Sequence, residues 1–424
     1  MRSFTFVHTA DCHLDTPFAG VGREDPALAS RLRDVQRQVF DDLIHLCLDR
    51  KAAFLVIAGD LYDAAERSLT TRVRLREAFR RLEAGDVEVF FAAGNHDHWG
   101  DRLRGFDFPP NVHVFSPDQP ETFLWPPDAP RAALTGISYG RPAIDANLAL
   151  RFPPPAGDVF NVAVLHCNVD GDPAHDNYAP CRIDDLLRAG YDYWALGHVH
   201  ERRILAGGPV TVVYSGCLQG RHVRETGEKG AVVVEVDAHG TTAVEFAPLD
   251  RFRWVEAEVD VSDAESDEEL AERLRQRGAE LVVGVPSRVH AIGVRWRLTG
   301  RLACDAAAVQ RVLEMLRETP PDEGLLVWPE SIDTRRTVAP VDLDELAAEA
   351  TPRGDLVRAV RDLRNDPAAL DEIRALLVDR TGPPEIAEEL RQRREAQRLE
   401  EPMIEAILDE AVRLGVDRLS RPLE

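Results

Sequence analysis

Apolar residues in the first hundred positions follow two spacings. Short apolar runs at 4–9, 54–58 and 87–93 predict β-strands, and the middle run is apolar throughout, as expected of a strand covered on both faces. Between them, residues 28–48 and 68–84 place apolar side chains at helical spacing. This strand–helix–strand–helix–strand order indicates an α/β architecture, in which ligand groups gather at the carboxyl ends of the strands.

After Trp99 the pattern changes to short apolar runs separated by Pro-rich turns. These runs predict strands at 112–115, 122–125, 131–137, 159–165 and 193–196. Two hairpin-like runs, at 210–214 and 231–236, are expected to complete a second sheet. Two sheets with outer helices predict a four-layer α/β sandwich.

The chain beyond residue 250 divides into two further regions. Residues 1–250 form the predicted α/β domain, and residues 251–338 alternate strands and helices as a small α+β domain. Residues 339–424 are predicted to be helical, and Pro402 should kink or split the last helix. The helices in that region are expected at 343–350, 354–365, 368–379 and 384–414.

Composition narrows the class of protein. The net charge is −23, from 51 basic and 74 acidic residues among 424, which disfavours a stand-alone, non-specific duplex binder. No apolar segment is long enough to span a membrane, and residues 1–8 lack the apolar core of a signal peptide. The six cysteines form no CxxC pair and are expected to be reduced thiols. We therefore expect a cytoplasmic protein without a membrane partner.

Residue types that bind metals follow five of the predicted strands. They are Asp11 with His13, Asp60, Asn95 with His96, His166, and His198 with His200. Each taken singly is typical of a turn or of a structural histidine. Their recurrence at successive strand ends within one α/β unit predicts a single shared site.

The mixture of carboxylate, amide and imidazole groups favours a two-metal site. Residues at i and i+2 of extended backbone project to the same side, so Asp11 with His13, and His198 with His200, can reach one cleft. Such ligands suit Mn²⁺, Fe²⁺ or Zn²⁺, whereas the absence of thiolate spacing argues against a structural zinc site. Asp60, at the central strand end, is the natural bridging carboxylate, and two such ions can clamp a phosphoryl group and hold a hydroxide in line for attack.

The order Asp-x-His, Gly-Asp, Gly-Asn-His-Asp, His and Gly-His-x-His resembles the calcineurin-like metallophosphoesterase superfamily. The resemblance implies that His96 donates a proton to the leaving oxygen or stabilises the transition-state charge, and that Asp97 orients its imidazole. It also implies two ligand sets that share one carboxylate. The first set is Asp11, His13, Asp60 and His200; the second is Asp60, Asn95, His166 and His198.

Two departures from the protein Ser/Thr phosphatase branch favour a diester substrate. Ala64 stands where that branch has a phosphate-gripping Arg, and Asp97 stands where it has Glu. The segments 59–63, 94–97, 214–222 and 225–230 resemble the SbcD/YhaO branch of DNA repair exonucleases. This likeness implies action on DNA ends with two divalent ions, Mn²⁺ first and Fe²⁺ or Zn²⁺ as alternatives. It also implies a coiled-coil, ABC-type (SbcC-like) ATPase as partner, and a homodimer.

Several residues are candidate contacts with these partners. Asp63 stands where some relatives carry a His proposed to help place DNA. Arg221, His222 and Arg224 suit a phosphate-contacting loop, with a solvated charged turn as the alternative. By the same resemblance, residues 251–338 cap the site and select DNA shape, and the C-terminal helices bind the coiled coil unless they are merely solvated. Leu103, Phe106 and Phe108 suit either a dimer contact or the core.

Two other functions remain open on the sequence. One is a small-molecule phosphodiesterase or phosphatase of the same fold. The other is a scaffolding subunit whose site does not turn over, although the intact ligand set argues against it.

Overall fold

The structure is a computed structural model that describes residues 2–14, 16, 18, 26–63, 69–99, 106–318, 325–338, 343–372 and a few positions between 408 and 419. The chain forms two compact units. The first contains Met1–Val259, Asp267–Arg297 and Ala306–Asp333, and the second contains Asp260–Ser266, Leu298–Asp305 and Thr334–Glu424. The expected boundaries near residues 250 and 338 stay predictions.

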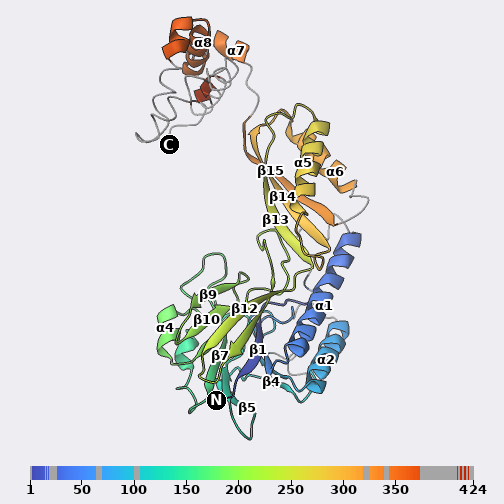
Figure 1. The fold of residues 1–424 in the computed structure, drawn as a ribbon, viewed down its shortest axis with the longest axis vertical. Coiled ribbons are helices and arrows are strands. Elements are labelled where there is room, and N and C mark those ends of the chain that lie inside the picture. Colours follow the sequence, from blue (N-terminus) through green and yellow to red (C-terminus); the bar gives the residue numbers. More distant parts are fainter. Residues whose placement is uncertain are drawn as a thin grey trace, which may run out of the picture. The chain divides into compact units, whose positions relative to one another are not determined.

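The first sheet carries the parallel strands expected at the amino end of the chain (Figure 1). Its order is β12-β11-β1-β2-β3-β4, with β1 parallel to β2, β2 to β3 and β3 to β4. The strands are β1 (Phe4–Thr9), β2 (Phe54–Ala58), β3 (Glu88–Ala92), β4 (Val112–Val114), β11 (Gly230–Val236) and β12 (Thr242–Pro248).

The placement of β11 corrects one expectation. Residues 231–236 were expected in the second sheet, but β11 pairs antiparallel with β1, with Phe4 opposite Val236. Its side chains alternate between two buried layers: Val232 and Val234 lie between the sheets, and Val233 packs on the helical side. An apolar run of this kind predicts a covered strand, but it does not specify which sheet contains it.

The second sheet has the order β5-β6-β7-β8-β10-β9. Its members are β5 (Glu121–Trp125), β6 (Ala132–Gly136), β7 (Phe160–His166), β8 (Tyr193–Gly197), β9 (Arg203–Ala206) and β10 (Thr211–Tyr214). Strands β9 and β12 were not predicted. Both lie at sheet edges and carry mostly exposed or half-exposed side chains.

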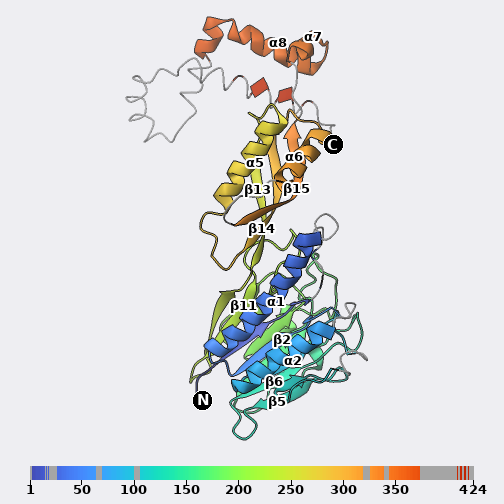
Figure 2. The ribbon, with the colours of Figure 1, turned by 90° about the vertical axis from the view of Figure 1, so that its right-hand side faces the viewer.

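The two sheets and their helices make the predicted four-layer α/β sandwich, which is confirmed. The helices α1 (Pro26–Asp49) and α2 (Leu69–Ala84) cover the outer face of the first sheet (Figure 2). An aromatic-rich layer that includes Phe6, Phe54 and Phe160 fills the space between the sheets. The 3₁₀ turn η1 (Ala149–Arg151) and α4 (Ile183–Arg188) cover the second sheet.

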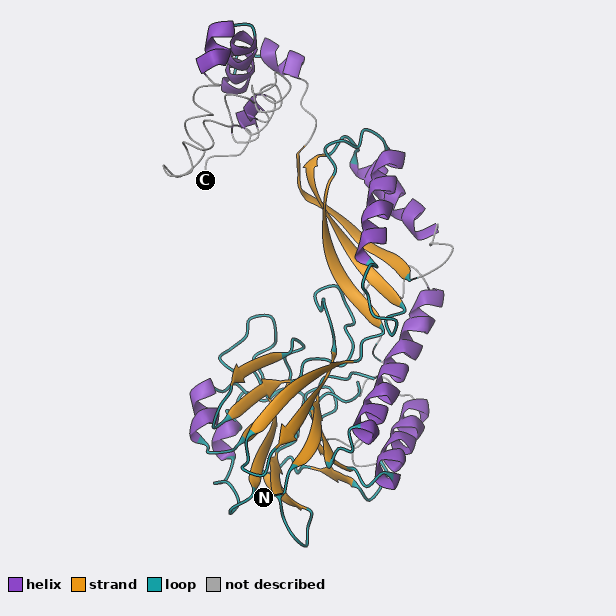
Figure 3. Cartoon of the chain, viewed as in Figure 1, coloured by secondary structure: helices purple, strands orange, loops and turns teal. Residues whose placement is uncertain are grey.

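The elements expected beyond residue 250 are present as an α+β layer and a helical segment (Figure 3). Strands β13 (Phe252–Asp260), β14 (Ala291–Arg301) and β15 (Leu326–Val338) form one sheet, accompanied by α5 (Asp267–Leu281) and α6 (Ala306–Glu318). The helices α7 (Leu343–Ala348) and α8 (Pro352–Arg364) follow. The helices expected at 368–379 and 384–414 lie largely outside the described residues. Within the described part, no helix has the length and apolar character needed to cross a bilayer.

Candidate metal centre

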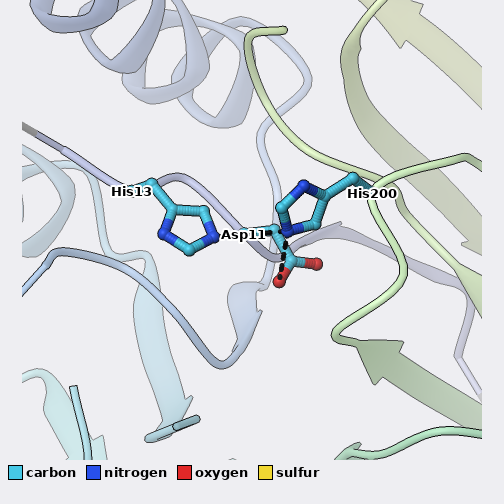
Figure 4. A group of neighbouring side chains, drawn as sticks. All are labelled: Asp11, His13 and His200. Carbon is cyan, nitrogen blue, oxygen red and sulfur yellow. Dashed lines mark hydrogen bonds and ion pairs between the residues drawn. The ribbon is translucent and has the colours of Figure 1, made fainter. Parts of the chain in front are cut away.

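The loops that follow β1, β2, β3, β7 and β8 converge and bring the expected metal ligands together. On one side, Nε2 of His13 lies 3.7 Å from Oδ2 of Asp60 and 3.3 Å from Nε2 of His200. Nε2 of His200 lies 3.8 Å from Oδ1 of Asp11, and Figure 4 shows these two side chains with His13 beside them. We call Asp11, His13 and His200 the first half of the site.

The second half of the site comprises Asn95, His166 and His198. Nε2 of His166 is 3.5 Å from Oδ2 of Asp60 and 3.0 Å from Oδ1 of Asn95. The imidazole rings of His166 and His198 are 5.2 Å apart. A single oxygen of Asp60 therefore faces a histidine of each half, which is where a shared carboxylate must lie.

The ligand-bearing backbone is not extended. β1 ends at Thr9 and β8 ends at Gly197, and the expected ligands beyond them adopt positive φ: 51° at Asp11, 44° at His13 and 95° at His198. Asp60 has φ 53°. The expectation that i and i+2 side chains project together from extended strands is therefore wrong. Non-glycine residues in this region are strained by about 1–3 kcal/mol each, and such strain clusters at functional sites.

Two glycines let the strand ends approach closely. Gly59 has φ 93°, and a Cβ there would lie 2.2 Å from Nδ1 of His166. A Cβ on Gly197 would lie 1.9 Å from the carbonyl oxygen of Ala58. These contacts explain physically why Gly precedes Asp60 and His198: the two sheets meet here with no room for a side chain.

Outer hydrogen bonds fix the orientation of three of the histidines. Nδ1 of His166 donates to the carbonyl of Ala58 at 2.9 Å, and Nε2 of His198 donates to the carbonyl of Asp176 at 2.7 Å. Nδ1 of His200 donates to Oε1 of Glu225 at 2.6 Å. When such a ring is neutral, its other nitrogen has a lone pair available for a metal.

The residues present fit divalent metal ions. Burial, with the charge of Arg221 and of nearby histidines, holds the pKa of His13 well below its usual range, and burial lowers the pKa of His198 to about 3. Both rings are therefore neutral ligands at pH 7. Acceptor atoms converge, as between His166 and Asn95 at 3.0 Å. Metal–ligand bonds of about 2.0–2.2 Å place neighbouring ligands at such spacings, and a cation offsets the cost of the buried Asp11 and Asp60 carboxylates.

The structure corrects the role expected for Asp97. Its fully buried carboxylate accepts hydrogen bonds from the backbone N–H groups of Gly94 and Leu61, each at 2.7 Å, and of Asp60 at 3.2 Å. Burial, with the charge of Asp60, raises the pKa of Asp97 to about 7. Asp97 thus fastens the loop after β3 to the loop after β2, and it does not orient the imidazole of His96.

The partner of His96 is Asp63. Nδ1 of His96 lies 3.5 Å from Oδ2 of Asp63, and the hydrogen bond with Asp63 raises the pKa of His96. The His96 side chain is 41% exposed, and its ring lies 4.7 Å from that of His13. His96 therefore borders the first half of the site with one face open to an incoming group.

The three candidate contacts after β10 are not equivalent. The side chain of Arg221 is only 12% exposed, and its guanidinium lies near enough to His13 and His96 for its charge to act on both rings. His222 is 38% exposed, and Arg224 is exposed. The structure therefore brings Arg221 to the site and leaves Arg224 at the surface.

Sequence reasoning missed two residues at the site. His175, on the loop after β7, has its ring 5.5 Å from that of His198 and 5.3 Å from that of His200. Glu225 is 5% exposed and holds His200. Neither stands directly at a strand end, so the signal that identified the other residues did not apply. Phe106 and Phe108, expected in a dimer contact or the core, pack on the core beside α2, whereas Leu103 lies outside the described residues.

Comparison with known proteins agrees with this geometry. The family described as calcineurin-like phosphoesterase matches residues 4–202. The metallophosphoesterase YhaO of Bacillus subtilis is 33% identical over 341 residues, which cover 78% of this chain and 82% of that protein. The chain therefore belongs to the calcineurin-like metallophosphoesterase family.

Two more distant relatives have names that state a role in DNA repair. The DNA double-strand break repair protein Mre11 of Methanopyrus kandleri is 25% identical over 417 residues, covering 90% of this chain and 84% of that protein. Mre11 of Aeropyrum pernix is 26% identical over 278 residues, covering 61% of this chain and 64% of that protein.

Proposed function

We propose that this protein is a Mn²⁺-dependent phosphodiesterase that removes nucleotides from DNA ends, in the cytoplasm and as part of DNA repair. The observation that carries the proposal is the placement of Asp60 between two clusters of metal-competent side chains, with the largely buried Arg221 beside them. The family supplies the hydrolase chemistry. The likeness to Mre11 proteins along most of the chain supports DNA as the substrate.

Asp11, His13, Asp60 and His200 would hold one ion, and Asp60, Asn95, His166 and His198 the other. Two divalent ions in such a site polarise a phosphodiester and lower the pKa of a bound water. His96 keeps a proton at Nε2 for the leaving oxygen, because Asp63 at Nδ1 favours its protonated form. The guanidinium of Arg221 adds positive charge for the phosphate oxygens.

The net charge of −23 bears on partners. A chain of this charge binds the DNA backbone weakly unless basic groups are concentrated at the site or supplied by another protein. We therefore propose that the nuclease works with a coiled-coil, ABC-type ATPase and as a homodimer. In this arrangement residues 251–338 cap the site and the helices beyond residue 339 bind the ATPase.

One assay tests the proposal. Purified full-length protein is given end-labelled duplex and single-stranded DNA, a bis-aryl phosphodiester and an aryl phosphomonoester, each with Mn²⁺, Mg²⁺ or a chelator. We expect nucleotide release and diester hydrolysis with Mn²⁺, both abolished by the chelator and by Asp60→Asn. His96→Ala should lower kcat by about 10²–10⁴-fold with metal content unchanged.

The other outcomes identify the alternatives. Hydrolysis of the monoester alone would contradict the nuclease proposal, and a cyclic nucleotide that outcompetes DNA would indicate a small-molecule phosphodiesterase. Metal binding without turnover of any substrate would indicate a scaffolding subunit.

A further inference from the structure

Glu225 contacts both the metal site and the loop that carries Arg221, His222 and Arg224. Its Oε1 accepts the hydrogen bond from Nδ1 of His200 at 2.6 Å and lies 3.3 Å from Nε2 of His222. Its Oε2 accepts from the backbone N–H of Arg221 at 2.6 Å, and the Arg221 guanidinium lies 3.8 Å from Oε1. One nearly buried carboxylate therefore contacts both an expected metal ligand and the arginine proposed to face the substrate phosphate.

Glu225 also differs from the other groups that hold the metal-facing histidines. His166 and His198 donate to the backbone carbonyls of Ala58 and Asp176, which are neutral and set by the fold. Among the histidines with a described outer partner, His200 is held by a charged side chain. A carboxylate partner makes an imidazole a stronger ligand than a carbonyl partner does. Removal of the carboxylate is therefore expected to weaken metal binding.

The loop that carries Glu225 is anchored independently of its carboxylate. Nε1 of Trp254 donates to the carbonyl of Gly220 at 3.1 Å, and the N–H of Gly227 donates to the carbonyl of Trp254 at 3.1 Å. Nε2 of Gln219 donates to the carbonyl of Phe252 at 2.6 Å. These bonds attach both ends of the loop to β13, and Val223 packs with Phe252 and Trp254. The backbone of the loop should therefore persist when Glu225 is changed.

A metal site at Glu225 itself is the competing interpretation. Cys217 lies close enough to His200 and Glu225 for the three to share an ion. However, burial raises the pKa of the Cys217 thiol far above its usual range, so the thiol stays protonated and is a poor ligand. The short bond between His200 and Glu225 also already uses the nitrogen that such an ion would need.

We propose that Glu225 is a positioning residue that couples the two parts of the site: its carboxylate fixes His200 with Nε2 toward the metals and holds Arg221 toward the substrate phosphate. The part concerning Arg221 rests on the proposed phosphodiesterase function, whereas the part concerning His200 depends only on metal binding. Loss of the carboxylate should therefore weaken one metal site and raise KM together.

The test compares Glu225→Gln with Glu228→Gln in the full chain. Glu228 lies in the same loop but is exposed and pairs with Arg253 and Arg288, so it controls for the loss of one negative charge. Mn²⁺ binding is followed by calorimetry. We expect Glu225→Gln to weaken one of the two sites by about 10–100-fold and to leave the other unchanged, whereas Glu228→Gln changes neither. With the bis-aryl phosphodiester, Glu225→Gln should also raise KM. Glu225→Asp, which keeps the charge, should restore part of the lost affinity.

If Glu225→Gln binds both Mn²⁺ ions with wild-type affinity, the proposal is overturned, even if the protein cleaves DNA. If wild-type protein binds two ions but cleaves nothing, the proposed function fails while the affinity comparison still decides the role of Glu225. A second measurement needs no variant. Long-range ¹⁵N–¹H spectra of histidine-labelled, metal-free wild-type protein should show a proton on Nδ1 of His200. The reverse tautomer would contradict the assignment.

Discussion

The two halves of the metal site are held in different ways. In the second half, the outer partners of His166 and His198 are backbone carbonyls, and Gly59 and Gly197 bring the two sheets into contact behind the rings. In the first half, His200 is held by the side chain of Glu225, and Nδ1 of His13 has no hydrogen-bond partner among the described residues. The second half is thus a product of the fold, whereas the first depends on individual side chains.

This difference predicts different responses to substitution. Changes behind the second half should act through folding and remove metal binding altogether. Changes around the first half should leave the fold intact and alter the affinity for one ion, the pH dependence or KM.

The largest effect is expected for Gly59→Ala. The new Cβ would lie 2.2 Å from Nδ1 of His166, in a backbone with φ 93°. The left-handed backbone alone costs about 1–2 kcal/mol, and the clash adds to it, so we expect a loss of about 3 kcal/mol or more in the free energy of unfolding. Bound Mn²⁺ should also fall. Denaturant unfolding in chelator and metal analysis measure these effects.

Gly208→Ala is the matched control for that change. Gly208 has φ 111°, and a Cβ there would meet nothing within 4 Å. The Gly208→Ala protein should lose only the backbone contribution, about 1–2 kcal/mol in the free energy of unfolding, and should keep its metals. Equal losses in the two variants would show that the contact with His166 is unimportant.

A smaller effect on stability is expected for Asp97→Asn. The amide keeps one acceptor oxygen for three backbone N–H groups and places an NH₂ group against the others. Leaving a buried donor unsatisfied costs about 1–3 kcal/mol, measurable by unfolding of the chelated protein. The half-exposed His96→Ala should instead change stability by less than about 0.5 kcal/mol. A stable Asp97→Asn protein with a shifted pH–rate profile would instead indicate that Asp97 orients the imidazole of His96.

The smallest effect is expected for Asp63→Asn, which should shift a pH profile and leave the fold unchanged. Asp63 raises the pKa of His96, so activity that needs protonated His96 falls as the pH rises through this raised pKa. Without the carboxylate the pKa drops, and the fall should move to lower pH. The rate of diester hydrolysis against pH measures the shift. Asp86→Asn, an exposed change before β3 at the end remote from Asn95, should leave the profile unchanged.

The sequence was sufficient for the layers and for the expected ligands that converge. A buried run such as 54–58 has the length and apolar pattern of a covered strand. The polar residues that follow such runs mark the carboxyl ends of the strands. It was not sufficient for the partner of β11, because a run covered on both faces fits either sheet. Nor did it predict the left-handed backbone at Asp11, His13 and His198, because strain at a site has no local sequence pattern.

The hydrogen-bond partners that hold the site residues could not be predicted from the sequence either. Glu225 meets His200 across 25 residues of chain, and the choice between Asp63 and Asp97 as the partner of His96 depends on the path of two loops. Spacing along the chain identifies candidate ligands at strand ends. It does not reveal which groups hold those ligands from behind.

Anomalous diffraction from crystals soaked in Mn²⁺ tests the central claim most directly. Two peaks are predicted on either side of Asp60: one contacted by Asp11, His13 and His200, the other by Asn95, His166 and His198. Glu225 should lie behind the first without contacting it. A single peak, or a peak held by Glu225 and Cys217, would contradict a two-metal site divided at Asp60.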